Sequence, residues 1–181
     1  MASCTIKSTE MYLSLLYDYL HKEIYNYHVL QADETPVLVT KDGRKAGSKS
    51  YMWVYRTGKM YKEHPIVLYE YQKTRNASHP REFLKEYGGV VVTDGYQVYH
   101  TLEKERENLT IAGCWSHSRR RFANMVKVLG KEKSKNSLAY DALKQIGAIY
   151  KLEESFSNLS PTERLKQRQL SIKPLVEAFF A

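Results

Sequence analysis

The segment GVVVTD at residues 89–94 constrains the fold of this chain more than any other feature. Its centre, residues 90–93, is continuously apolar, as expected for a strand buried in the middle of a sheet. A second apolar segment, HVLQAD at residues 28–33, is also read as a strand and also ends in an aspartate followed by a polar turn. We therefore expect an α/β fold in which Asp33 and Asp94 lie at the tips of two buried strands.

The order of the other expected elements narrows the fold further. Short connections join the first three strands, which favours an antiparallel meander. The expected elements are a helix at 8–22, strands at 28–40, 51–57 and 66–71, a helix at 79–87, a strand at 90–93, a helix at 96–107 and a strand at 110–115. Three strands followed by helix, strand, helix and strand is the order of a ribonuclease H-like domain, in which the first and fourth strands are neighbours. We predict a mixed five-stranded sheet flanked by helices.

The charge distribution divides the chain into a near-neutral front and a basic, helical back. Residues 1–116 carry 15 Lys+Arg against 14 Asp+Glu, whereas residues 117–181 carry 13 against 6. Pro161 is expected to open one helix of the back half, and Pro174 to interrupt another. We expect a lead-in helix at 1–27, a core at 28–117 and a basic helical appendage or insertion at 118–181. The net charge of +7 suggests a polyanionic partner, although a solvated helical surface is an equally ordinary explanation.

Asp33 and Asp94 are the candidate metal ligands. Carboxylates on two neighbouring strands can share divalent cations, an arrangement used to cleave phosphodiester bonds. A single aspartate at a strand end is more often a turn-former, but here two occur in matched contexts. Glu34 would point to the opposite face of the strand, so it is a weaker ligand candidate.

A second motif, CWSHSRRRF at residues 114–122, joins candidate metal ligands to a run of arginines. Cys114 and His117 have the spacing of half a zinc site, but no second pair follows, which argues against zinc. The guanidinium groups of Arg119–Arg121 could track a phosphate backbone, or they could form an exposed basic turn.

The bulk composition excludes some classes of protein. No apolar stretch approaches the roughly 18 residues of a membrane-spanning helix, and no export signal is recognisable. Two cysteines do not suggest a disulfide framework, so a reducing cytoplasm is expected.

Several motifs, taken together and in order, resemble the transposases of the insertion-sequence-66 family. The matching residues are His28 with ADETPV at 32–37, MWVY at 52–55, TR at 74–75, HPREFL at 79–84, TDGY at 93–96 with Tyr99, and CWSHSRRRF at 114–122. The resemblance implies a DDE-type transposase core that uses two magnesium (or manganese) ions to cleave and join DNA strands. Asp33 and Asp94 match its first two acids. Arg119, Arg120 and Arg121, with His117 and Arg75, are expected to contact DNA.

The sequence offers two candidates for the third acid of the triad. Glu153 lies at an acceptable spacing, and Glu177 is a weaker candidate. Residues 118–181 resemble a helical insertion that precedes the family's third acid, so we favour an incomplete triad in a chain that resembles a fragment. The expected partners are the DNA ends of an insertion sequence and target DNA, and a second copy of the chain or other transposition proteins are further candidates. A catalytically inactive DNA-binding or transposase-interacting module and a host nuclease of the same fold are the alternatives.

Overall fold

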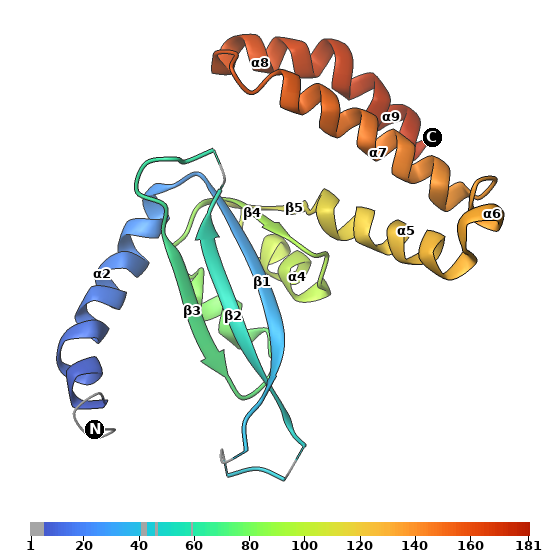
Figure 1. Cartoon of the computed structure of the whole chain (residues 1–181). Coiled ribbons are helices and arrows are strands. Elements are labelled where there is room, and N and C mark those ends of the chain that lie inside the picture. Colours follow the sequence, from blue (N-terminus) through green and yellow to red (C-terminus); the bar gives the residue numbers. More distant parts are fainter. Residues whose placement is uncertain (1–5, 41–42, 46, 59) are drawn as a thin grey trace. The chain divides into compact units, whose positions relative to one another are not determined.

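The chain forms two compact units, residues 1–114 and 115–181. The computed structural model describes residues 6–40, 43–45, 47–58 and 60–181 (Figure 1). The division between the units lies three residues before the boundary expected at 117/118. Trp115 belongs to the second unit because its ring packs against Phe179 and Phe180, with centroids 5.5 and 6.1 Å away.

The first unit is built on a five-stranded mixed sheet. Its strands are β1 (Val29–Leu38), β2 (Lys49–Thr57), β3 (Val67–Gln72), β4 (Gly89–Thr93) and β5 (Leu109–Gly113), in the spatial order β3-β2-β1-β4-β5. The first three strands form the predicted antiparallel meander. β4 pairs in parallel with both β1 and β5, so the predicted neighbourhood of the first and fourth strands is confirmed.

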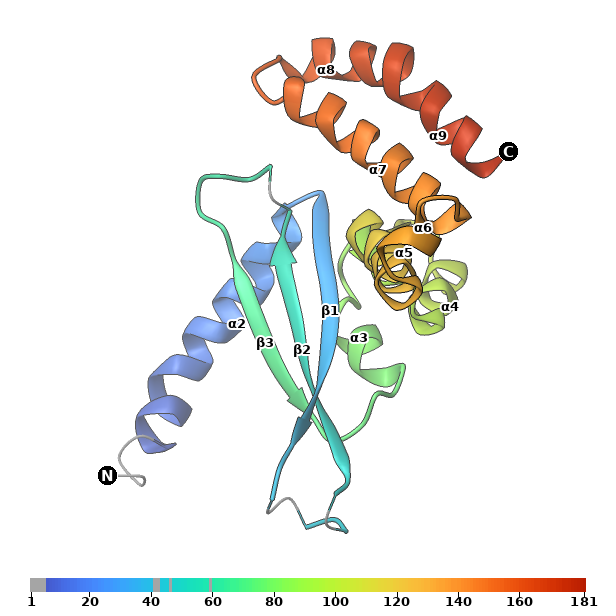
Figure 2. The ribbon, with the colours of Figure 1, turned by 45° about the vertical axis from the view of Figure 1, so that its right-hand side comes forward.

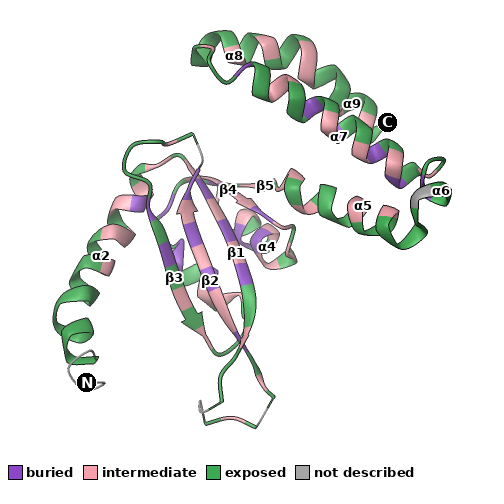
Figure 3. Ribbon diagram, viewed as in Figure 1, coloured by how far each residue is buried: buried purple, intermediate pink, exposed green. Residues whose placement is uncertain are grey.

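The described helices of this unit build the core on one face of the sheet. They are α2 (Ser14–Glu23), α3 (Ser78–Phe83) and α4 (Gln97–Glu105), with a wider helical turn at Thr9–Leu13 before α2 and a short one at Ile24–Asn26 after it. Residues that face these helices are buried in alternation along the strands (Figures 2 and 3). The rings of Tyr55 and Phe83 stack 3.5 Å apart within this core. On the other face of β3, Val67, Tyr69 and Tyr71 are exposed.

Gly89 lets β4 approach β1 closely. Its backbone has φ +154°, and a Cβ atom at this position would lie 2.6 Å from the carbonyl oxygen of His28. The next amide, that of Val90, donates to this same carbonyl at 2.9 Å and begins the parallel pairing. Glycine is therefore required where β4 begins, because any side chain would push the two strands apart.

The helix expected at 79–87 is shorter than predicted, since α3 ends at Phe83. The guanidinium group of Arg106 donates to the carbonyl oxygens of Leu84 and Tyr87, which follow the end of α3. The amide of Tyr87 also donates to the carbonyl of Leu84 at 3.0 Å, so a tight turn and one arginine side chain take the place of further helix.

The second unit consists of helices, as predicted. They are α5 (Trp115–Leu129), α6 (Lys131–Ser134), α7 (Leu138–Ser155), α8 (Pro161–Gln167) and α9 (Lys173–Phe180), with a wider π-type turn at Arg168–Ile172. α7 runs antiparallel to α8 and α9 (Figure 1), and it buries one stripe of small and branched side chains, Ala139, Ala142, Ile146 and Ile149.

Both prolines of the second unit stand where a helix begins. Pro161 follows Ser160, whose side chain forms a capping box with Glu163. Pro174 lies in the first turn of α9, directly after the π-type turn, because proline has no amide hydrogen to continue the regular ladder. No helix in the described part of the chain is both long and apolar enough to cross a bilayer.

Candidate functional site

Asp33 and Asp94 come from neighbouring parallel strands. The β1–β4 register pairs Gln31 with Val92, and the two aspartates follow two residues later on each strand. The polar turn expected directly after Asp33 is absent. β1 instead continues to Leu38 against β2, with Glu34 opposite Trp53 and Pro36 opposite Tyr51. Pro36 can be accommodated because β1 has by then lost its partner on the β4 side.

Glu34 lies on the core face of β1, as its alternation with Asp33 predicted. Its side chain is only 1% exposed, and its Oε1 atom accepts hydrogen bonds from both Nε (2.7 Å) and Nη2 of Arg75. The Oε2 atom has no hydrogen-bonding partner among the residues described. Burial raises the pKa of the Glu34 carboxyl, and the hydrogen bonds and charge of Arg75 oppose this effect. Glu34 is therefore a buried acid that depends on one arginine.

The guanidinium group of Arg75 is held on several sides. Arg75 lies in the loop between β3 and α3, and its guanidinium carbon stands 3.8 Å from the centre of the Tyr96 ring. The hydroxyl of Tyr96 donates to the backbone carbonyl of Arg75 at 2.7 Å. Tyr96 thus contacts both ends of the same residue, which restricts the side chain of Arg75 to one position.

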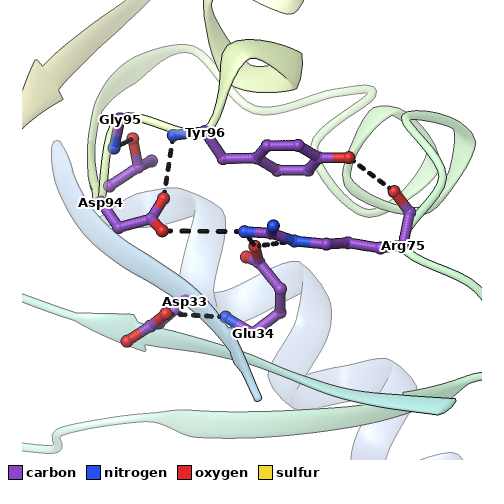
Figure 4. A network of polar contacts seen from close by, with 7 residues as sticks. Asp33, Glu34, Arg75, Asp94, Gly95 and Tyr96 are labelled. Atoms are coloured by element: carbon purple, nitrogen blue, oxygen red, sulfur yellow. Dashed lines mark hydrogen bonds and ion pairs between the residues drawn. The ribbon is translucent and has the colours of Figure 1, made fainter. Parts of the chain in front are cut away.

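The carboxylate of Asp94 faces this arginine. Its Oδ2 atom lies 3.7 Å from Nη2 of Arg75, and its Oδ1 atom accepts the backbone amide of Tyr96 at 2.9 Å. Figure 4 shows the guanidinium group between the carboxylates of Glu34 and Asp94, whereas the carboxylate of Asp33 points away from it. Oδ1 of Asp33 accepts the backbone amide of Glu34 at 2.9 Å. Asp33, Glu34, Arg75 and Asp94 are called the acidic-end cluster below.

The two candidate third acids both lie in the second unit, where each contacts a cation. Glu153 forms a two-pronged ion pair with Arg168, and hydrogen bonding from this arginine lowers the pKa of Glu153. The Oε1 atom of Glu177 lies 3.7 Å from Nζ of Lys173, which is one turn earlier on α9. In the described part of the chain, no three His, Cys, Asp or Glu side chains are grouped so that they could hold a metal ion.

The expected DNA-binding residues fall into two different settings. Arg119, Arg120 and Arg121 are exposed on α5, where consecutive residues are 100° apart, so the three side chains cover more than half of the helix circumference. His117 is half-buried in the first turn of the same helix. Arg75 is different: its guanidinium is engaged by Glu34 and Tyr96.

A family model described as "Transposase IS66 family" matches residues 1–181, the whole chain. The chain belongs to the IS66 transposase family. Two similar curated proteins of Sinorhizobium fredii are both described as uncharacterized. Protein y4qI is 27% identical over 177 residues, which cover 93% of this chain and 32% of that protein. Protein y4jD is 28% identical over 173 residues, which cover 91% and 33%. The chain spans about a third of the length of these relatives.

Among solved structures, the IS66-family chain is similar to a chain of the simian T-cell lymphotropic virus intasome in complex with the PP2A regulatory subunit B56 gamma. The sequence identity is 13% and the TM-score is 0.33, with 77% of this chain and 45% of that chain covered.

Sequence reasoning missed the pairing of Glu34 with Arg75 in this IS66-family chain. The alternation along the strand makes Glu34 only a weaker ligand candidate, on the face opposite Asp33, but a glutamate among core-facing positions also indicates that a cation must accompany it. Arg75 was 41 residues away, and only the folded loop before α3 identifies it as the partner.

Proposed function

We propose that this chain forms part of the catalytic core of a DNA transposase, in which Asp33 and Asp94 bind Mg²⁺ or Mn²⁺. The observation that carries the proposal is the parallel pairing of β1 with β4, which brings two carboxylates 61 residues apart in sequence to the same end of this pairing, two residues beyond Gln31 and Val92. Carboxylate oxygens are the ligands that these hard cations prefer. Membership of a transposase family supports the assignment.

The residues present suit such a cation but supply only part of its coordination. Asp33 and Asp94 offer oxygen ligands, and the ion pair between Glu34 and Arg75 adds no net charge beside them. Bound metal would supply activation of a water or a 3′-hydroxyl and stabilisation of the leaving oxygen. We propose water molecules and phosphate oxygens of DNA as further ligands. We do not assign that role to Glu153, whose carboxylate is ion-paired with Arg168 in the second unit.

DNA is proposed as the partner of the second unit. Residues 115–181 carry 13 Lys+Arg against 6 Asp+Glu, a net charge of +7. Arg119–Arg121 are exposed on α5. Contacts of this kind are made to phosphates, so they position the nucleic acid without selecting its sequence.

The decisive test replaces each aspartate by asparagine in a complete transposase that carries this core. Asp33→Asn and Asp94→Asn keep the side-chain size and remove a ligand charge, so each should reduce strand cleavage at least about 100-fold, since metal supplies several kcal/mol of transition-state stabilisation. Glu105→Gln is the matched control, because Glu105 is an exposed acid paired with Arg81 on the outside of the same unit. Normal cleavage by either aspartate variant would refute the metal assignment.

A catalytically inactive DNA-binding module is the second candidate. The two-carboxylate ligand set and the excess of positive charge in the second unit favour it. Titration of this chain with Mn²⁺ separates the two candidates. Binding that is lost in Asp94→Asn supports the metal site, and DNA binding without any Mn²⁺ binding supports the inactive module.

A further inference from the structure

Arg75 is the basic member of the acidic-end cluster, and it contacts two of the acids directly. The cluster has three carboxylates, those of Asp33, Glu34 and Asp94, and the charges of both aspartates oppose ionisation of Glu34. Arg75 is the cation that contacts two of them, Glu34 through hydrogen bonds and Asp94 at 3.7 Å. With Glu34 and Arg75 paired, the cluster retains the two negative charges of the aspartates, which one divalent cation neutralises.

In the ion pair between Glu34 and Arg75, the buried Glu34 restricts the more exposed Arg75. The side chain of Glu34 is 1% exposed and that of Arg75 is 38% exposed. An ionised carboxylate at such depth needs its partner, so Arg75 cannot leave without a large penalty. The face of Tyr96 and the hydrogen bond from its hydroxyl hold the rest of Arg75 in place.

We propose that Arg75, anchored by Glu34 and Tyr96, is a positioning residue that sets the orientation of the Asp94 carboxylate for metal binding. This inference rests on the proposed function. The guanidinium stands beside Oδ2 of Asp94 while the Tyr96 amide takes Oδ1, so each oxygen of Asp94 faces a donor held by the same tyrosine. Such outer groups commonly tune a metal site through the ligand that they contact. The proposal gives Arg75 a different role from the DNA contact that was expected in the sequence analysis.

A charge-matched variant separates positioning from simple electrostatics. In the double variant Glu34→Gln with Arg75→Met, the net charge of the cluster is unchanged and no buried charge is left unpaired, so folding should be retained. If Glu34 and Arg75 act only through their charges, the double variant should bind Mn²⁺ with unchanged affinity. Positioning predicts affinity weaker by roughly tenfold, the lower end of what outer-shell substitutions cost. Arg75→Lys also keeps the charge but loses the two-pronged fork and the stacking on Tyr96, so it should weaken binding as well.

The measurement is a Mn²⁺ titration of the whole chain, followed by the electron paramagnetic resonance of the free ion at 20 °C. Circular dichroism confirms that each variant is folded at this temperature, and Arg75→Lys provides the test should the double variant fail to fold. Arg81→Met is the control, since it breaks the exposed ion pair with Glu105 and should leave affinity unchanged.

The outcomes are distinct. A wild-type chain that binds no Mn²⁺, or that binds equally after Asp94→Asn, contradicts the proposed function. Wild-type binding that depends on Asp94 but is unchanged in the double variant and in Arg75→Lys overturns the positioning role alone. Tighter binding in the double variant also overturns it, because Arg75 would then be restraining Asp94 away from the metal. Weaker binding in these variants, with the control unchanged, supports the proposal.

Discussion

At the scale of single residues, Tyr87 shows how a polar group in the core responds to its surroundings. Its ring is fully buried, and its hydroxyl lies within hydrogen-bonding distance of the carbonyl oxygens of His28 (2.8 Å) and Val90 (3.2 Å). Burial raises the pKa of Tyr87 to about 12, and it does the same for Tyr25 beside α3. Both phenols therefore remain protonated in the folded chain at pH values where an unfolded chain ionises.

This difference predicts a loss of stability in alkali. Below pH 10 both states hold the phenol proton, so Tyr87 adds no pH dependence. Between pH 10 and about 12 the unfolded chain releases the proton and the folded chain does not, so the free energy of unfolding falls as the pH rises. At pH 12, Tyr87 accounts for about 2 kcal/mol of the loss in the free energy of unfolding. Urea unfolding from pH 8 to 11.5 should show a shallower decline for Tyr87→Phe than for the wild type. An unchanged slope would contradict the assignment, and Tyr19→Phe, at an exposed tyrosine, is the control.

At the scale of elements, the contact between β1 and β4 depends on Gly89. We expect Gly89→Ala to lower the free energy of unfolding by about 2–3 kcal/mol, since φ of +154° is strained for alanine and the new Cβ would meet the rigid carbonyl of His28. Gly88→Ala is the matched control one residue earlier. There the nearest atom is the side-chain nitrogen of Asn108 at 3.0 Å, which can move. Chemical denaturation of both variants checks the prediction, and equal losses would show that the strand contact tolerates a side chain.

The elements differ in how far the sequence reveals them. The run of valines in β4 and its place in the order of elements were enough to predict its position beside β1. The end of α3 could not be predicted, because Arg106 satisfies the carbonyls of Leu84 and Tyr87 from a distant part of the chain. The same holds for the site: Asp33 and Asp94 stand out from their strands, whereas the link from Glu34 to Arg75 exists only once the loop before α3 has folded.

At the scale of the whole molecule, the two units carry very different charges. The first has a net charge of +1 and the second +7. Replacing Arg119, Arg120 and Arg121 by alanine should weaken binding to duplex DNA, because a protein that neutralises phosphates gains affinity from released counterions. The slope of log affinity against log salt should become shallower by up to about 2.7, or about 0.9 for each phosphate that is no longer neutralised. Fluorescence anisotropy at several salt concentrations measures this slope.

The control for the DNA experiment removes the same amount of charge from the first unit. Lys7, Lys22 and Lys104 are exposed cations there, and their replacement by alanine should leave the slope closer to that of the wild type. If both triple variants reduce the slope equally, the interaction with DNA follows net charge and is not localised to α5.

The parallel pairing of β1 with β4 also has a consequence for the order of folding. The meander of β1, β2 and β3 can form from contacts close in sequence, but Asp33 and Asp94 become neighbours only after a segment of about 60 residues has closed into a loop. Closing such a loop costs chain entropy before any contact repays it, so this pairing is expected late. While β4 is still inside the ribosome, the nascent chain can form the sheet of β1, β2 and β3 but cannot yet bring Asp33 and Asp94 together. If Asp33 and Asp94 bind metal as proposed, that ability should appear only once β4 has paired with β1.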